Sequence, residues 1–354
     1  MLINLFLPPM GSLFVKYSSF LLTFQVTLPE SSIDPEIINT PESPYRFILY
    51  AALVLALVYF IARSQTSRLI KTKKLLKEKE QALELVAYQK VELEIKDKNL
   101  TDSLIYAQRI QEAILPSEAY FRNFFGDSFI LFRPKDIVSG DFYWIGDKND
   151  KIFLAAADCT GHGVPGALMS MIGHELIENA INEENIEIPS KILAVLDKGL
   201  EKTFSREKNI GTIIRDGMDI GLCVIDKKRM KMIYTGAFFP LYLIRDNSLI
   251  EVKGDKIIIG MNPDGLPYTD HEIDLKEDDI LYIFSDGYVD QFGGLENKKF
   301  MYRRFRHLLL NIHKFPLSDQ KAILDENIRN WMGRNVQVDD LMVIGFRPLS
   351  GGSK

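Results

Sequence analysis

The sequence predicts an α+β protein in which a layered sandwich of strands and helices follows one transmembrane helix and one coiled-coil helix. Three observations carry this prediction: an uncharged apolar run near the N-terminus, a seven-residue repeat behind it, and grouped short strands with helical stretches between them after Pro116. The 354 residues, 46% of them hydrophobic and 26% charged, suffice for one large globular domain with appendages.

Composition and charge argue against a nucleic-acid binder and against a disulfide-rich or thiolate-metal protein. A formal net charge of −5 at pH 7 disfavours a nucleic-acid binder, because phosphate backbones are bound by an excess of Lys and Arg. The two cysteines, Cys159 and Cys223, are too few for a disulfide framework or a thiolate metal site. We therefore expect the bulk of the chain to lie in a reducing compartment, with both cysteines as small core residues.

Residues 1–46 are interpreted as an apolar N-terminal segment followed by a short external linker. The first thirty residues lack the basic region of a signal peptide and are interrupted by Pro8, Pro9 and Lys16. The sequence leaves open whether this segment is a weak signal peptide, a second anchor left from a longer sensor, or a misassigned start.

Residues 47–62 are expected to form a transmembrane helix. The run FILYAALVLALVYFIA between Arg46 and Arg63 carries no charged or strongly polar group. Its length of roughly 24 Å falls short of a hydrocarbon core of ~30 Å, but flanking arginines can snorkel and Tyr45 and Tyr59 suit the interface. A buried core helix is the alternative, although such a helix normally keeps one polar face.

The charges on either side of this run predict its orientation. Acidic residues precede it, at Glu30, Asp34, Glu36 and Glu42, and basic residues follow it, at Arg63, Arg68, Lys71, Lys73, Lys74 and Lys77. The positive-inside rule places the basic side in the cytoplasm. We therefore expect a single-pass membrane protein with everything after Arg63 in the cytoplasm.

Residues 64–115 are expected to form a coiled-coil signalling helix. Apolar residues recur every seven positions, at Val86, Leu93, Leu100, Ala107 and Ile114, with a second seam at Leu69, Leu76, Leu83 and Leu104. Lys90 and Asp97 interrupt the second seam. The pattern favours a parallel homodimer, because a single helix has nowhere else to bury the stripe; a solitary solvated helix is the alternative.

Residues 116–348 are expected to form the globular domain. Short β-like runs alternate with amphipathic helical stretches near 164–182, 189–205, 298–312 and 316–332. The runs are SFILF, KIFLAAAD, DIGLCVID, MKMIYTGA, PLYLIR, DILYIFSD and DLMVIGF. Strands joined by short turns, such as the pair around Lys227-Lys228-Arg229, are hairpin-like and antiparallel. Grouped strands with inserted helices predict a layered sandwich rather than a doubly wound parallel sheet.

Acidic residues recur at strand ends or tight turns beside glycine. They are Asp141 in SGDFYW, Asp158 in AAADCTGHG, Asp286 in FSDG, and Asp339 with Asp340 in QVDDLMVIG. The sheet holds the backbone at a strand end, and glycine lets the chain turn close to a ligand. The pattern suits a hard divalent cation; the alternative is that each aspartate only forms a turn or caps a helix.

Carboxylate ligands select Mg²⁺ or Mn²⁺ over zinc, and no His and Cys residues have zinc-like spacing. Two such ions about 3.5 to 4 Å apart would bridge a water, lower its pKa and direct hydroxide at phosphorus. Several converging carboxylates without a cation would repel one another. We therefore expect two divalent cations, Mn²⁺ or Mg²⁺.

These motifs resemble the SpoIIE-like branch of the PPM (protein phosphatase 2C-like) phosphatases, which includes the RsbU-like stress-response phosphatases. The resemblance runs from about Ile114 to Phe346 and is carried, in order, by SGDFYW, ADCTGHGVPGALMSMIG, DGMDIGLCVID, GD before an IG step, YIFSDGYVDQFGG and VDDLMVIG. It implies a four-layer α-β-β-α sandwich with a two-metal centre between the sheets. Phe238-Phe239 stand where relatives usually carry Asn-Asn.

The resemblance also implies roles for single residues. Asp158 corresponds to the carboxylate that bridges both ions, and Cys159 to the position whose backbone carbonyl contacts one of them. Asp286 and Asp339 correspond to further metal ligands, with Asp340 as second choice for the latter. Asp141 corresponds to the residue that holds metal-bound water, and Gly287 shapes the turn beside Asp286.

Three further residues are candidates for the chemistry. His162, four residues after Asp158 rather than two as in animal relatives, is a candidate to protonate a leaving serine alkoxide, the alternative being a turn-stabilising role. Arg133 and Lys135 precede the first acidic motif and are candidates for binding the substrate phosphate. A solvated surface role is the alternative for both.

The resemblance implies a metal-dependent protein phosphatase that acts on phosphoserine or phosphothreonine of a signalling partner. A common substrate in the family is a phosphorylated anti-sigma-factor antagonist in a partner-switching pathway. The alternative is a non-catalytic phosphatase-like module that binds a partner under control of the membrane and coiled-coil segment. Hydrolysis of a small phosphoester or cyclic nucleotide is a third interpretation.

Overall fold

The computed structural model describes residues 44–205 and 216–349. The chain divides into two compact units, Met1–Glu92 and Leu93–Lys354. The proposed N-terminal segment and linker therefore lie almost wholly outside the described residues. The boundary between the two units falls inside one long helix.

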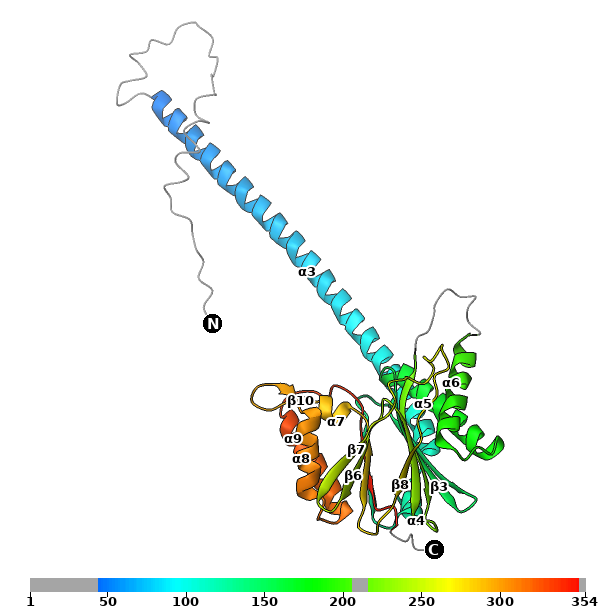
Figure 1. Ribbon diagram of the computed structural model, residues 1–354. Helices are drawn as coiled ribbons and strands as arrows, with labels where there is room; N and C mark the ends of the chain where they lie inside the picture. The colour runs from blue at the N-terminus through cyan, green and yellow to red at the C-terminus, as the bar shows by residue number, and fades with distance from the viewer. Residues whose placement is uncertain (1–43, 206–215, 350–354) are drawn as a thin grey trace. The chain divides into compact units, whose positions relative to one another are not determined.

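Helix α3 (Pro44–Ile114) is a single α-helix of 71 residues (Figure 1). It contains both the apolar run at 47–62 and the heptad segment at 64–115, because no glycine or proline interrupts the sequence between Arg46 and Leu115. Among the described residues it is the one helix long and apolar enough to cross a membrane, and no part of its most apolar window is buried. Length and composition alone support this assignment.

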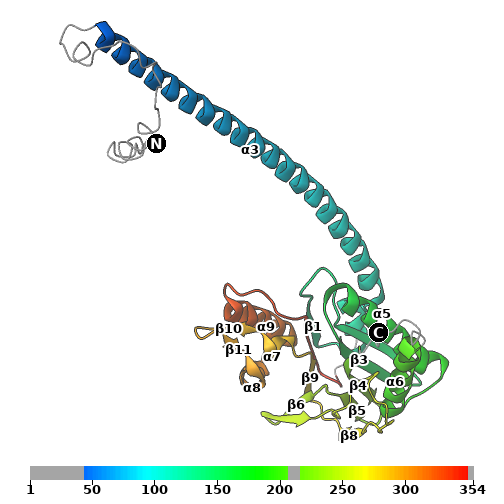
Figure 2. The same ribbon diagram turned by 90° about the horizontal axis from the view of Figure 1, so that it is seen from above.

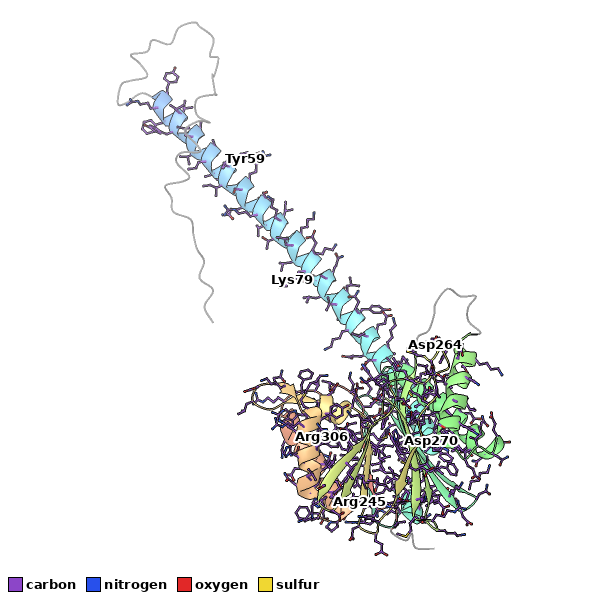
Figure 3. The ribbon with its side chains drawn as sticks, in the orientation of Figure 1. Tyr59, Lys79, Arg245, Asp264, Asp270 and Arg306 are labelled. Atoms are coloured by element: carbon purple, nitrogen blue, oxygen red, sulfur yellow. The ribbon has the colours of Figure 1, made fainter. Side chains whose placement is uncertain are left out.

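The heptad side chains of α3 are exposed in the single chain. Leu83 and Val86 are each 59% exposed, Leu93 is 67% exposed and Leu100 is 60% exposed. Figure 3 shows side chains standing out from this helix, Tyr59 and Lys79 among them. The apolar stripe is therefore available to a second copy of the helix.

Ten strands of the C-terminal unit form two antiparallel five-stranded sheets. In the first sheet the order is β1 (Ser128–Arg133), β12 (Leu341–Phe346), β9 (Ile280–Phe284), β6 (Leu241–Arg245) and β7 (Ser248–Val252). In the second it is β2 (Phe142–Lys148), β3 (Lys151–Cys159), β4 (Met218–Asp226), β5 (Lys231–Ala237) and β8 (His271–Asp274). The first and last strands of the domain pair along their whole length, which ties its two ends together.

Helices cover the outer face of each sheet (Figures 1 and 2). Against the second sheet pack α5 (Gly163–Glu178), the π-helix η1 (Asn179–Glu183) and α6 (Pro189–Ser205). Against the first pack α8 (Met301–Ile312) and α9 (Leu317–Met332). The shorter elements are α4 (Glu118–Phe124), α7 (Gly287–Asp290) and the hairpin of β10 (Phe292–Gly293) and β11 (Lys298–Lys299).

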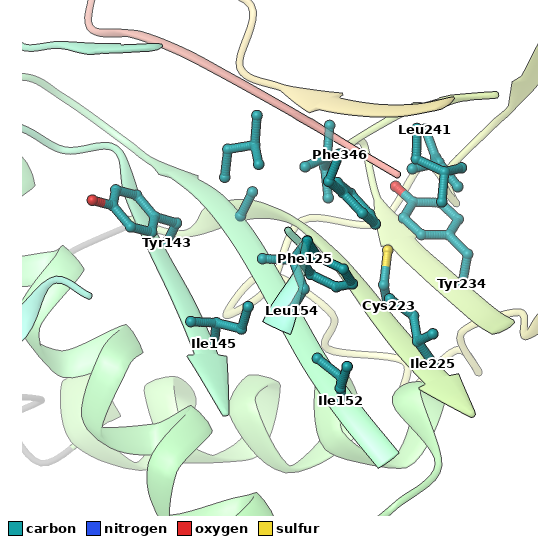
Figure 4. Packing of buried hydrophobic residues seen from close by; sticks show 14 of the residues in the cluster. Phe125, Tyr143, Ile145, Ile152, Leu154, Cys223, Ile225, Tyr234, Leu241 and Phe346 are labelled. Carbon is teal, nitrogen blue, oxygen red and sulfur yellow. The ribbon is translucent and has the colours of Figure 1, made fainter. Parts of the chain in front are cut away.

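Three hydrophobic clusters separate four layers. Alternate residues of each strand point to opposite faces, so one set fills the space between the sheets and the other meets the helices. Leu154, Tyr234 and Phe346 meet between the sheets (Figure 4). On the outer face of the second sheet Phe153 packs towards α6, and on the outer face of the first sheet Tyr282 packs towards α8 and α9. The four-layer α-β-β-α sandwich is confirmed.

The structure refines several expected elements. The hairpin around Lys228 is confirmed, since Asp226 pairs with Lys231. The helix expected at 164–182 ends as a π-helix, and residues 298–299 of the expected helix 298–312 form a strand instead. Strands β2, β7 and β8 are additions, because their short or partly polar runs carry a weak alternation signal. Cys159 and Cys223 are buried free thiols, as expected.

Candidate functional site

Acidic side chains from both sheets gather beside the ends of their central strands. Asp158 near the end of β3 is the register partner of Asp219 near the start of β4. Asp286 lies in the turn between β9 and α7, and Asp339 lies two residues before β12. These carboxylates are close enough for the charges of Asp286 and Asp339, from the first sheet, to raise the pKa of Asp158 in the second. The structure therefore brings carboxylates of the two sheets near one another.

The electrostatics of this cluster are unfavourable in the absence of a cation. Burial, and then the charges of Asp286 and Asp339, raises the pKa of Asp158 well above its ordinary value. Burial and the charge of Asp286 raise the pKa of Asp219 to about 7. Desolvation by the surrounding protein, with the charges of Asp290 and Asp339, raises the pKa of Asp286 to about 6. Each shift has the same cause: negative groups held together away from water.

Asp141 is the most deeply buried member of the group. It lies directly before β2, and its side chain is fully buried beside Ser285, which follows β9. Its Oδ2 accepts a hydrogen bond of 2.6 Å from the Ser285 hydroxyl, whereas its Oδ1 has no partner among the described residues. Burial and the charge of Asp158 raise the pKa of Asp141 well above its ordinary value. A buried oxygen without a partner is costly, so this atom is suited to a water or an ion.

Asp340 holds the loop between β1 and β2 in place. Its Oδ1 accepts a hydrogen bond from the Lys135 backbone N–H at 2.7 Å, and its Oδ2 accepts one from the Gly140 N–H at 2.6 Å. Asp339 uses one carboxylate oxygen, which accepts from the Asp340 N–H at 2.9 Å. Asp339 is therefore the better placed of the two to bind a ligand.

Two glycines bring backbone atoms close to the cluster. A Cβ on Gly287 would lie 1.8 Å from the Asp340 carbonyl oxygen, so only glycine lets α7 begin against that segment. A Cβ on Gly140 would lie 3.2 Å from the carbonyl oxygen of Cys159. Burial, followed by the charge of Asp158, raises the pKa of the Cys159 thiol well above its ordinary value, so it stays protonated. Its carbonyl is the group that Cys159 can offer to an ion.

The three further candidates differ in their surroundings. The Nδ1 of His162, which is exposed, lies 2.7 Å from the Oδ2 of Asp136 in the β1–β2 loop. The Nη1 of Arg133 lies 3.4 Å from the Oδ1 of Asp325 on α9, so this guanidinium is directed towards α9. The ammonium of Lys135 makes no ion pair with any described residue. Lys135 is therefore the better candidate for a phosphate contact.

The structure adds three residues that sequence reasoning missed. Asp219 is a carboxylate beside Asp158, and an acidic residue within the apolar run MDIGLCVID was a signal that could have revealed it. Ser285 orients Asp141, and its place in FSDG was a weaker signal. Gln111 carried no local signal, because only its tertiary contacts distinguish it from the other glutamines of α3.

Gln111 joins the last turn of α3 to the acidic cluster. It is 4% exposed, and its Nε2 donates to the Ser139 carbonyl at 2.6 Å and to the Ser170 hydroxyl of α5 at 2.9 Å. Its Oε1 accepts from the Ser139 N–H at 3.0 Å. The Ser139 hydroxyl in turn accepts from the Asp141 N–H at 3.0 Å. One side chain thus connects α3 to the residue that carries the unpartnered oxygen.

The donors present fit a divalent cation by their chemistry and charge. The Oδ1 of Asp141 is buried without a partner, and the mutual repulsion of the carboxylates would be relieved by positive charge. No three His, Cys, Asp or Glu residues within 44–205 and 216–349 are already grouped as the ligands of one ion. The fit therefore rests on the nature of the donors and their convergence.

Comparisons with known proteins place the C-terminal part of the chain among known families. A family model described as Stage II sporulation protein E matches residues 148–348. Phosphoserine phosphatase RsbU of Bacillus subtilis (strain 168) is 25% identical over 169 residues, which are 44% of this chain and 44% of RsbU. The chain therefore matches less than half the length of that curated relative.

Two solved structures share the fold. The SiaA-PP2C domain of Pseudomonas aeruginosa is 33% identical, with a TM-score of 0.65, covering 71% of this chain and 98% of that domain. The PP2C phosphatase domain of SpoIIE from Bacillus subtilis, solved with a fragment of its regulatory domain, is 18% identical with a TM-score of 0.50, covering 62% of each chain. The second likeness concerns the fold alone. With its motifs, its sandwich and the family match in agreement, the chain belongs to the SpoIIE family, in the RsbU-like branch of the PPM phosphatase fold.

Proposed function

We propose that this protein is a metal-dependent protein serine/threonine phosphatase that hydrolyses phosphoserine or phosphothreonine on a signalling partner. The observation that carries the proposal is the convergence of Asp158 and Asp219 from one sheet with Asp286 and Asp339 from the other: burial and the charges of Asp286, Asp339 and Asp219 raise the pKa of Asp158. The phosphoserine phosphatase named among the relatives supports the same chemistry.

We propose two divalent cations, Mn²⁺ or Mg²⁺, as the cofactors. Asp158, the Cys159 carbonyl, Asp286 and Asp339 would hold them, with Asp340 as the second choice beside Asp339. When bound, such ions lower the pKa of a water and stabilise the charge that develops on phosphorus. The described carboxylates supply the negative charge that this role requires.

The chain's own side chains then have distinct tasks. The Oδ1 of Asp141 would hold and orient a water, and the Ser285 hydroxyl keeps Asp141 in position. Lys135 would contact the substrate phosphate through its unpaired ammonium, while Arg133, paired with Asp325, would be the secondary phosphate contact. His162, oriented by Asp136, would give a proton to the leaving serine oxygen.

We further propose a single-pass membrane protein with the catalytic domain in the cytoplasm. The apolar run at 47–62 and the basic residues after it support this arrangement. The exposed heptad stripe of α3 supports a homodimer through a coiled coil at 64–115. The phosphatase domain would occupy residues 116–348, and a phosphorylated anti-sigma-factor antagonist in a partner-switching pathway is the proposed substrate.

A non-catalytic module that binds a partner is the second candidate. One observation favours it: the described acidic side chains are not already grouped as the ligands of an ion. In that case the same domain would bind a partner protein, and α3 would control this binding.

Hydrolysis of a phosphoserine peptide by the full chain in detergent micelles tests the first proposal. We expect turnover with Mn²⁺ that EDTA stops and that Asp158→Ala lowers by at least about a thousandfold, because the bridging position is lost. Asp246→Asn is the matched control, since Asp246 lies on an exposed turn after β6, at the opposite end of β9 from Asp286. Metal-independent binding of a partner without turnover, unchanged by Asp158→Ala, would support the second candidate instead.

A further inference from the structure

A basic pocket lies between α8 and α9, beside the β10–β11 hairpin. Its volume is about 940 Å³. Arg303, Arg304 and His307 of α8 line one side, and the amides of Asn311, Asn327 and Asn330 line it as well. No acidic residue lines it in the described part of the chain, although the whole protein carries a net charge of −5. The pocket is thus a local positive site on an acidic molecule.

Most of these polar side chains have no partner within the protein. The side chains of Arg303, His307, Asn311 and Asn330 make no hydrogen bond or ion pair with the residues that the structure describes. The Oδ1 of Asn327 is buried and also has no partner among them. Arg303, His307, Asn311 and Asn330 are exposed, so their polar groups are free to contact a ligand, whereas the buried Asn327 oxygen is a group that a ligand could satisfy.

The apolar floor of the pocket does not favour a nucleotide. The Arg304 guanidinium lies 4.7 Å from the centre of the Trp331 ring and also donates to the Phe300 carbonyl at 3.3 Å. The rings of Phe300 and Trp331 are nearly perpendicular, with their centroids 5.3 Å apart. A Cβ on Gly294 would lie 2.7 Å from a ring carbon of Trp331. Trp331 is therefore occupied by the fold, and a base would find no free ring to stack on.

The pocket adjoins the acidic cluster through the chain segment that joins them. Lys299 lies two residues before α8, and its Nζ is 2.7 Å from the Oδ2 of Asp290 at the end of α7. The Phe300 N–H donates to the Gln291 carbonyl at 2.9 Å. Helix α7 itself begins directly after Asp286. The pocket is therefore joined to the cluster through α7 and the segment that pairs with it.

We propose that the α8–α9 pocket binds an acidic peptide segment of the phosphoprotein substrate. Arg303 and His307 pair with its carboxylates, and the asparagine amides, which both donate and accept, bond to its backbone. Arg306, the next arginine of α8, is excluded from this role because its Nη1 lies 3.0 Å from the Oε2 of Glu251 on β7. That the peptide belongs to the substrate rests on the proposed function, whereas binding of an acidic peptide in the pocket does not depend on it.

Binding of a fluorescein-labelled, phosphate-free peptide of alternating Glu and Ser tests the pocket directly. With the full chain in detergent at low salt, we expect fluorescence anisotropy to show binding that Arg303→Gln with His307→Gln weakens about tenfold, because each exposed charge contact contributes modestly. Arg303→Lys should retain most of the affinity. Arg229→Gln, on the exposed β4–β5 turn, removes the same charge elsewhere and should leave binding unchanged.

Three results would overturn the proposal. The first is equal affinity for the double variant and the unaltered chain, and the second is equal affinity for a peptide with Gln in place of Glu. The third is complete displacement of the peptide by inorganic phosphate or ATP at the peptide's own concentration, which would make the pocket a small-anion site.

Turnover separates this proposal from the proposed function. A phosphoserine peptide extended by the acidic segment should show a KM about tenfold below that of the short peptide, and the double variant should remove the difference. If no phosphopeptide is hydrolysed while pocket-dependent binding persists, the phosphatase assignment fails and the pocket stands. If turnover is present and the extension has no effect, the pocket proposal alone fails.

Discussion

Asp219 faces Asp158 across neighbouring strands, and burial together with the charge of Asp286 raises its pKa. A carboxylate whose folded pKa lies above its unfolded value keeps its proton in the folded state at pH values where the unfolded chain has already lost it. Stability is then lost progressively as the pH rises from about 4 to the folded pKa. For Asp219 and Asp286 the folded values are about 7 and about 6.

We therefore expect the metal-free full chain to lose stability as the pH rises from 5 to 8, by roughly 4 kcal/mol. Thermal unfolding in EDTA should show the melting temperature falling over this range, with a smaller fall for Asp219→Asn. Mn²⁺ should raise the melting temperature more at pH 8 than at pH 5. Asp246→Asn should keep the original slope, and a melting temperature that rose with pH would contradict the sign.

Phe238 and Phe239 differ sharply in their surroundings although they are adjacent. Phe238 is 46% exposed with a φ of 51°, a left-handed conformation that asparagine tolerates better than a bulky aromatic residue. Phe239 is 2% exposed in the core between the sheets. The amides usual in relatives thus suit the backbone at the first position, whereas the second aromatic belongs to the core.

Phe238→Asn should stabilise the protein by about 0.5 to 1 kcal/mol, because it relieves the backbone and leaves the N–H bond to the Asp255 carbonyl intact. Phe239→Asn should destabilise it by about 3 kcal/mol or more, since it removes a buried ring and buries an amide. Urea unfolding measures both changes. Equal effects of the two substitutions would show that the local backbone conformation does not matter here.

Helix α3 is one continuous element, and its final turn is built into the domain while its earlier turns are exposed. Gln111 is the residue that makes this connection, through three hydrogen bonds to Ser139 and Ser170. Because the Ser139 hydroxyl also accepts from the Asp141 N–H, a displacement of this turn would shift Asp141 in the acidic cluster. Gln108, three residues earlier, bonds only along the helix, to Glu112.

Gln111→Ala should destabilise the C-terminal unit by about 1 to 3 kcal/mol, because it leaves the buried backbone N–H and carbonyl of Ser139 without partners. It should also lower kcat more than it raises KM, since the orientation of Asp141 is disturbed. Urea unfolding and steady-state kinetics with a phosphoserine peptide measure the two effects. Gln108→Ala is the matched control on the same helix; equal behaviour of the two variants would remove Gln111 from any positioning role.

At the scale of the whole molecule, α3 carries an apolar stripe that the single chain leaves uncovered. Leu83, Leu93 and Leu100 all lie on it, and each is more than half exposed. Exposed leucines at heptad spacing are stabilised when a second helix packs against them. Dimerisation through α3 would join two copies of the chain by this helix.

Light scattering of the full chain in detergent should give a protein mass twice the 40.5 kDa of one chain. Leu93→Glu with Leu100→Glu should yield monomers, because charges at seam positions repel across the coil. Gln81→Glu adds a charge outside both seams and should leave the dimer intact. A monomeric unaltered chain would show that α3 remains a solitary helix.

Much of the architecture could be predicted from the sequence because its signals are local. The apolar run, the heptads and the helical faces each repeat within a few residues, so periodicity alone reports them. Acidic residues beside glycine at strand ends marked Asp141, Asp158, Asp286 and Asp339 as candidates for one site. Strand β2 escaped prediction because FYWIGDK combines a buried aromatic run with a polar end.

Only the tertiary structure could decide which of these groups meet and which are already engaged. Asp340 accepts hydrogen bonds from the backbone of Lys135 and Gly140, about two hundred residues away in the sequence, whereas Asp339 does not. Contacts over such separations depend on how the sheets stack, which no local pattern encodes. The α8–α9 pocket arises in the same way, from the packing of two helices whose individual sequences show only an ordinary amphipathic face.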